Sequence, residues 1–61
     1  MALNSKGIIT RITGPVVDIK FDENGLPDIF HAVEIHSGEE VFTLEVLQHL
    51  GKGEVRCISM Q

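Results

Sequence analysis

Three histidines are the residues of this chain best suited to hold a metal ion, because three imidazoles that leave one position open can bind zinc. They are His31, His36 and His49. His31 and His36 lie five residues apart, so on one extended strand their side chains point to opposite faces. His49 belongs to a predicted turn. This spacing favours three separate structural histidines, and we predict no metal site.

The residues that suit nucleophilic or acid–base chemistry are placed unfavourably. Cys57 lies within a predicted strand without a histidine base close to it in the sequence, and such a cysteine is commonly a small core hydrophobe. The carboxylate pairs Asp22-Glu23 and Glu39-Glu40 fall in predicted turns, where water solvates the charges. We therefore predict no catalytic residues.

A nucleotide site would require a phosphate-binding loop: Gly, any four residues, Gly-Lys and then Ser or Thr. The nearest segment is Gly51-Lys52-Gly53-Glu54, which has a glutamate where the hydroxyl for magnesium should be. No helix is predicted after it, so no helix N-terminus would face a phosphate there. We interpret the segment as a hairpin turn and predict no cofactor-binding residues in this chain.

Asp18 and Arg56 are the polar residues that we single out as an interface. Each is charged and lies within a predicted strand among apolar neighbours rather than in a turn. We expect both side chains to face outward, where they meet either a neighbouring protein domain or water. The sequence leaves these two alternatives open.

Length and composition exclude several classes of protein. With 61 residues the chain is at most one small domain with a thin core. The net charge of −4 and the scattered basic residues argue against a nucleic-acid surface, which requires clustered Lys and Arg. The single cysteine excludes an internal disulfide and a Cys-rich zinc site. No apolar run approaches the roughly 20 residues that cross a bilayer, so no membrane insertion is expected.

The hydrophobic pattern has a period of two, in short runs separated by turn residues, which indicates an all-β fold. The predicted strands are residues 7–13, 16–21, 29–36, 41–48 and 54–60. Gly14-Pro15, Asn24-Gly25 and Gly51-Lys52-Gly53 supply turn residues between them. Because the chain is too short to fill two stacked sheets, we predict a small closed or nearly closed antiparallel β-barrel, as a single domain over residues 1–61.

Alternation along the strands assigns the two faces of the sheet. In the first strand Ile8, Thr10 and Ile12 are expected to share one face, and residues 9, 11 and 13 the other. In the second strand the odd-numbered residues are expected to face inward. The predicted core is Val17, Ile19, Phe21, Val33, Ile35, Phe42, Leu44 and Val46.

The order and spacing of several short runs resemble the opening segment of the F-type ATP synthase β subunit over nearly the whole chain. No single run is specific, but their combination is. The paralogous α subunit and the flagellar and secretion ATPases open with a similar barrel but share fewer of these runs. The runs are Gly7–Ile19, which contains Gly-Pro-Val-Val-Asp, then Phe21, Leu26-Pro27, Leu44-Glu45-Val46, His49-Leu50-Gly51 and Val55–Met60.

The resemblance implies a non-catalytic structural and assembly domain, a six-stranded barrel in the crown of a hexamer of alternating α and β subunits. Neighbouring barrels pack side by side there, so ATP synthase α and β subunits are the implied partners. ATP or ADP and magnesium bind the following domain of the parent chain, the catalytic subunit of a proton-transporting enzyme. The implied location is cytoplasmic and peripheral to the inner membrane. A start without a signal or transit peptide favours a bacterial source, and an organelle-encoded chain would look the same.

Family members continue past the position of Gln61 into a loop and a last barrel strand. From the resemblance we therefore expect five of the six strands and an open sheet edge. The unpaired N–H and C=O groups of such an edge accept a strand from another chain. The fragment is expected either to self-associate through this edge or to be loosely folded.

The alternative function is a free-standing small β-barrel that binds an oligonucleotide, an oligosaccharide or a protein partner. Recognition of the first two requires exposed aromatic residues and a basic groove. The aromatic residues here are Phe21, Phe30 and Phe42, with no Trp or Tyr. An independent enzyme is disfavoured as well, since the sequence shows no nucleophile–base pair, metal cluster or phosphate loop.

Overall fold

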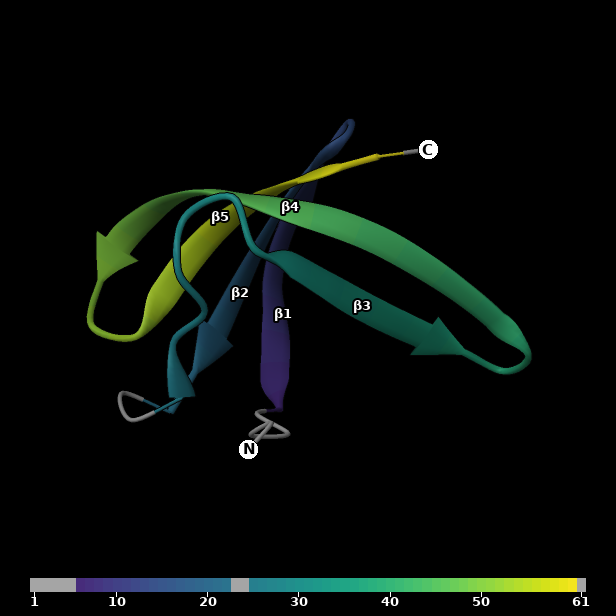
Figure 1. Ribbon diagram of the computed structural model, residues 1–61, viewed down its shortest axis with the longest axis horizontal. Helices are drawn as coiled ribbons and strands as arrows, with labels where there is room; N and C mark the ends of the chain where they lie inside the picture. The colour runs from purple at the N-terminus through teal and green to yellow at the C-terminus, as the bar shows by residue number, and fades with distance from the viewer. Residues whose placement is uncertain (1–5, 23–24, 61) are drawn as a thin grey trace.

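One curled sheet of five antiparallel strands makes up the computed structural model, which describes residues 6–22 and 25–60. The order across the sheet is β1-β2-β5-β4-β3, so the last strand joins the hairpins β1–β2 and β3–β4. Figure 1 shows β4 arching over the shorter strands. The all-β prediction is confirmed. The strands are β1 (Gly7–Thr13), β2 (Val16–Phe21), β3 (Ala32–Ser37), β4 (Glu40–Gly51) and β5 (Glu54–Ser59).

The sheet is an open half-barrel. Within the described ranges β1 and β3 form its two edges, and no ladder joins them. The architecture agrees with a small β-barrel domain, but the ring of strands is not closed by these residues. Each edge therefore keeps a row of unpaired backbone N–H and C=O groups.

The third and fourth strands differ from their predicted bounds. β3 begins at Ala32 rather than at residue 29, because residues 29–30 form a turn in which Phe30 has a φ of +71°. The N–H of Phe30 donates to the carbonyl of Val46 over 2.7 Å, which holds this turn against β4. β4 runs from Glu40 to Gly51 rather than over residues 41–48, and two irregularities in its pairing with β5 let it bend along the way.

A β-bulge at Thr10 changes which residues of β1 face the core. Ile9 pairs with Ile19, and beyond the bulge Ile12 pairs with Val17. Directly paired residues share a face, so Ile9 and Ile12 lie on the core side, while residues 8, 11 and 13 lie on the outer side. The simple alternation predicted for this strand is wrong, because the extra residue shifts the pleat by one position.

The core is one apolar layer on the inner face of the curled sheet. Val33 and Ile35, both expected in it, are partly buried and pack against it. Phe42, also expected there, is 37% exposed and lies outside it, because β4 carries it past the covered part of the inner face. The prediction missed Val55, which is fully buried together with Cys57 on the central strand. The buried members are Val17, Ile19, Phe21, Leu44, Val46, Val55 and Cys57.

Two leucines of β4 provide a matched test of this core. Leu44 is 2% exposed and Leu47 is 40% exposed. Leu44→Ala should lower the free energy of unfolding by about 2–5 kcal/mol, because it removes buried apolar atoms and leaves a cavity. Leu47→Ala should cost less than about 1 kcal/mol. Urea unfolding followed by circular dichroism measures both, and equal losses would contradict the core assignment.

Candidate functional site

A cross-strand ion pair is the strongest polar contact on the outer face of the sheet. Asp18 of β2 stands opposite Arg56 of β5 in the ladder. Arg56 Nε donates to Asp18 Oδ1 over 2.9 Å, and Arg56 Nη2 donates to Asp18 Oδ2 over 3.0 Å. Two parallel charge-assisted hydrogen bonds fix both the distance and the orientation of the two groups. The sequence singles out both residues, and the structure adds that they bind each other.

Asp18 lies on the outer face, yet it is buried. The residue is 5% exposed, whereas the side chain of Arg56 is 41% exposed. One of the two expected alternatives, an Asp18 that faces water, is wrong, because both carboxylate oxygens accept hydrogen bonds from Arg56 and the side chain is only 6% exposed. Arg56 keeps an exposed side, and its contact with a neighbouring domain stays a prediction.

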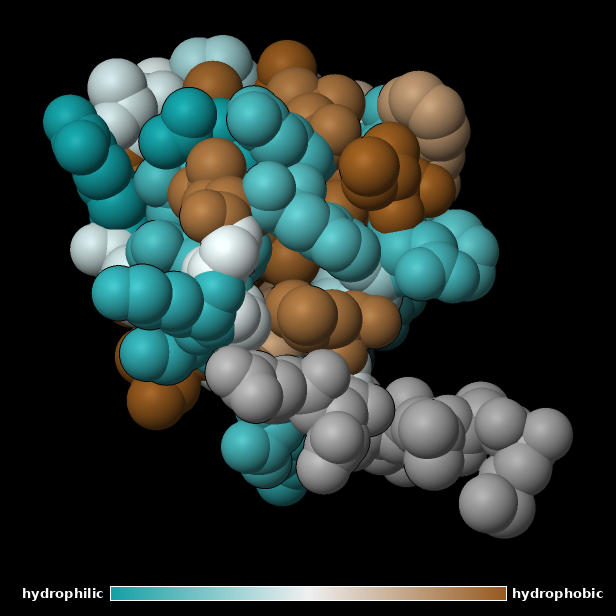
Figure 2. Space-filling model, turned by 90° about the vertical axis from the view of Figure 1, so that its left-hand side faces the viewer, coloured by the Kyte–Doolittle hydropathy of each residue, from teal (hydrophilic) through white to brown (hydrophobic). Residues whose placement is uncertain are grey.

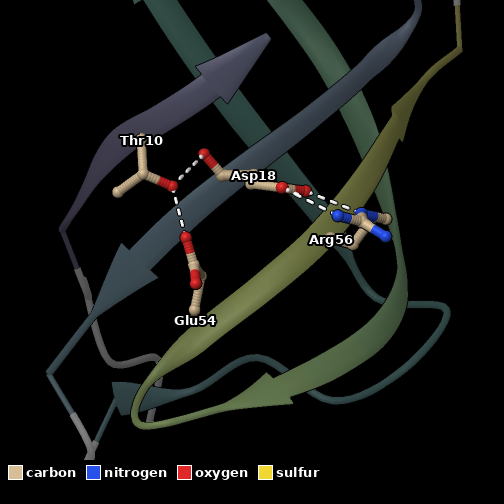
Figure 3. A network of polar contacts seen from close by, with 4 residues as sticks. All are labelled: Thr10, Asp18, Glu54 and Arg56. Atoms are coloured by element: carbon tan, nitrogen blue, oxygen red, sulfur yellow. Dashed lines mark hydrogen bonds and ion pairs between the residues drawn. The ribbon is translucent and has the colours of Figure 1, made fainter. Parts of the chain in front are cut away.

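Thr10, the bulge residue of β1, connects this edge strand to the pair. Its hydroxyl oxygen lies 3.2 Å from the carbonyl oxygen of Asp18 and 2.5 Å from Glu54 Oε2 (Figure 3). The hydroxyl has a single hydrogen, so Thr10 donates it to only one of these two acceptors at a time. The contact joins β1, β2 and β5 at one point on the outer face.

The charges around the pair set the titration of Asp18. The hydrogen bonds from Arg56 lower its pKa, burial opposes them by disfavouring the charged form, and the charges of Arg56 and Arg11 lower the pKa further. In return, the bonds to the Asp18 carboxylate raise the pKa of Arg56. Arg11 pairs with Asp18 in the ladder between β1 and β2. The carboxylate therefore lies between two arginines on adjacent strands.

Each histidine makes its own local contact. His49 Nε2 lies 2.6 Å from the carbonyl oxygen of Pro27, so this nitrogen carries the hydrogen and donates it. His36 Nε2 lies 3.2 Å from Glu34 Oε1 at an exposed position. The backbone N–H of His31 donates within the turn before β3. In residues 6–22 and 25–60 no three His, Cys, Asp or Glu side chains are grouped to hold a metal ion.

Cys57 lies in the core, and the glycine-rich segment forms the hairpin turn between β4 and β5. Cys57 is a free thiol in the core, and burial together with the charge of Asp18 raises its pKa, which disfavours a reactive thiolate. The hairpin turn between β4 and β5 contains Lys52 at a φ of +56°. Glu54, which follows this turn, accepts a hydrogen bond from β1.

The carboxylate pairs in turns remain apart from the ion pair. Glu39 and Glu40 are exposed at the β3–β4 turn, and Asp22 is exposed after β2. Glu23 lies outside the described residues.

The described part of the chain contains no helix long and apolar enough to cross a bilayer.

An antiparallel half-barrel with an apolar layer on one face and an ion pair on the other belongs to the class of small β-barrel domains. The model of the ATP synthase alpha/beta family, beta-barrel domain, matches residues 9–61. This match covers most of the chain, so the chain belongs to that family. The resemblance seen in the sequence is confirmed at this level, which includes α and β subunits alike. The barrel domain of this family is non-catalytic.

Sequence reasoning missed Arg11 and Thr10 as parts of the site. Both lie on β1, and the bulge that places them cannot be read from alternation. It also did not predict that residues 18 and 56 meet, because 38 positions separate them. The available signal was their opposite charge in two strands that are otherwise apolar at alternate positions.

Removing Arg56 should raise the pKa of Asp18. Arg56→Gln takes away the hydrogen bonds and charge that lower this pKa, while the burial that raises it remains. In the unchanged protein the folded-state pKa lies below the ordinary value of 3.8. The pair therefore stabilises the fold fully above about pH 4, and this contribution is lost as the pH falls through the folded-state pKa.

An NMR titration of the Asp18 carboxyl carbon measures this shift. Lys20→Gln is the control, because it removes a cation from β2 that makes no contact with the pair. An Asp18 midpoint that stays the same in Arg56→Gln would contradict the electrostatic account.

Proposed function

We propose that this chain is the amino-terminal barrel of an ATP synthase β subunit, a structural and assembly domain that packs in the crown of a ring of alternating α and β subunits. The family match over residues 9–61 carries the proposal. The choice of β over α rests on the ordered runs of the sequence, above all Gly14–Asp18, Leu44–Val46 and Val55–Met60.

The electrostatics of the described residues support an assembly role rather than chemistry. The strongest charged contact is a satisfied pair: both oxygens of Asp18 accept hydrogen bonds from Arg56, and the lowered pKa makes this carboxylate a weaker base than an unpaired aspartate. We assign ATP or ADP, magnesium and catalysis to another domain of a proton-transporting parent enzyme. That parent complex would be peripheral to the inner membrane on its cytoplasmic side, in a bacterium or, less favoured, an organelle.

Exposed apolar side chains support packing against neighbouring barrels. Ile12 is 65% exposed, Phe30 72% and Met60 59%. Figure 2 shows apolar patches on one face of the molecule, separated by polar side chains. Apolar surface bordered by polar groups suits a protein–protein contact. An oligonucleotide- or oligosaccharide-binding barrel is disfavoured by the family match, and the net charge of −4 further disfavours binding of an oligonucleotide.

A domain graft tests the proposed function. This chain should replace the barrel of a catalytic subunit from a reconstitutable ATP synthase, and the chimera should assemble with α subunits into the hexameric ring. A catalytic subunit without its barrel should not assemble. Native mass spectrometry measures the assemblies. The same graft on the α subunit is the matched control, since assembly there but not in the β position would overturn the β assignment.

We also propose that copies of this chain associate through β1. All seven residues of this edge strand are exposed, and Ile8 is 73% exposed. An apolar edge offers its unpaired N–H and C=O groups to an incoming strand, and copies of the same strand can pair there. The bulge at Thr10 limits the length of regular pairing, so we expect a weak, concentration-dependent dimer.

Sedimentation velocity over a range of concentrations tests this association. Ile8→Lys should shift the chain to the monomer, because a charged side chain on the edge opposes pairing. Met60→Lys introduces the same charge at another exposed apolar position, 59% exposed, and should leave the dimer intact. A monomer at every concentration in the unchanged chain would refute the proposal.

A further inference from the structure

A shallow recess opens beside the Asp18–Arg56 pair on the outer face. It has a volume of about 320 Å³ and is lined by Arg11, Thr13, Val16, Asp18 and Arg56. These residues come from β1, β2 and β5, which are joined by antiparallel ladders. The recess is therefore formed by the sheet itself rather than by a loop.

Two guanidinium groups border the recess, and their hydrogen-bonding capacity is only partly used. Arg56 donates to Asp18 through Nε and Nη2, which leaves the N–H groups of Nη1 for another acceptor. The guanidinium of Arg11 makes no side-chain hydrogen bond or ion pair with another residue in the described ranges, although it carries five donors. The hydroxyl of Thr13 adds one more polar group to the lining.

The charge of the recess favours a monovalent anion. Its two guanidinium groups and one carboxylate leave a single net positive charge, on a chain whose net charge is −4. A carboxylate matches that charge, and its two oxygens match the planar donors of arginine. A phosphoryl group carries about two negative charges at neutral pH and would be held against the buried carboxylate of Asp18.

We propose that this recess, named here the Arg11–Arg56 recess, is a docking site for the carboxylate of an aspartate or glutamate on a neighbouring protein chain. The carboxylate binds between Arg11 and the Nη1 side of Arg56, and Thr13 and Val16 form the rim. Asp18 is a positioning residue, since it holds Arg56 from the buried side. That the neighbour is an ATP synthase subunit rests on the proposed function, whereas the recognition chemistry does not.

A titration of the labelled chain with two blocked peptides tests the recess. The probes are acetyl-Ala-Glu-Ala-amide and its glutamine counterpart, and the readout is the ¹H–¹⁵N spectrum with the arginine Nε–H signals included. The glutamate peptide should give saturable shifts at Arg11, Thr13, Val16 and Arg56 that weaken with added salt. The glutamine peptide should give none.

Variants at Arg11 distinguish binding of the peptide in this recess from its non-specific attraction to a basic surface. Arg11→Gln should weaken binding about two- to fivefold, the range for one exposed charge pair. Arg11→Lys should fall between Arg11→Gln and the unchanged chain, because the charge stays while the planar fork is lost. Lys52→Gln, which removes a cation from the β4–β5 turn, is the matched control and should bind as the unchanged chain does.

Equal binding of both peptides, equal effects of Arg11→Gln and Lys52→Gln, or shifts spread over the whole chain would overturn the proposal. Concentration-dependent shifts at Val16 and Arg56 that persist in Ile8→Lys, in which pairing through β1 is blocked, would also overturn it, in favour of a second copy as the occupant. The titration uses no ATP synthase subunit. Its failure is therefore distinguishable from a failure of the grafted barrel to assemble.

Discussion

The pairing of β5 with both β2 and β4 is the constraint on which the rest of the structure depends. Each hairpin, β1–β2 or β3–β4, closes over a short stretch of chain, but a lone hairpin is marginal in water. With β5 between them, Val17 and Val46 lie on either side of Cys57, where the deepest burial is found. The apolar layer therefore forms only after distant parts of the chain meet, and the entropy of that closure must be offset by the burial that follows.

On the outer face, the contact between β2 and β5 is polar, and it fixes the register of these two strands. Asp18 and Arg56 face each other across β2 and β5, directly between core pairs on the other face. A slip of one residue would turn Asp18 into the apolar layer and separate it from its guanidinium partner. Buried ion pairs add little net stability compared with apolar contacts, so the apolar layer stabilises the sheet and the pair selects one alignment of it.

This small domain has an open sheet, and the open sheet leaves surfaces that a neighbouring barrel would cover in the proposed assembly role. A 61-residue chain buries a modest part of its surface, and here β1 and β3 remain edges within the described residues. Exposed apolar side chains on β1 and a recess with unused arginine donors lie on surfaces that a neighbour can cover. A barrel domain of the ATP synthase alpha/beta family that packs beside other barrels would gain from its neighbours the burial that it lacks alone.

The sequence by itself determined the all-β class, the family and the inward faces of β2 and β4, because these follow from local alternation, turn residues and ordered runs. Only the tertiary structure decided the bulge at Thr10, the exposure of Phe42 and the contact between Asp18 and Arg56. A bulge is defined by the partner strand, exposure depends on what covers a face, and an ion pair depends on which strands are neighbours. Alternation along one strand contains none of this information, since it reports a residue's face and not what lies opposite it.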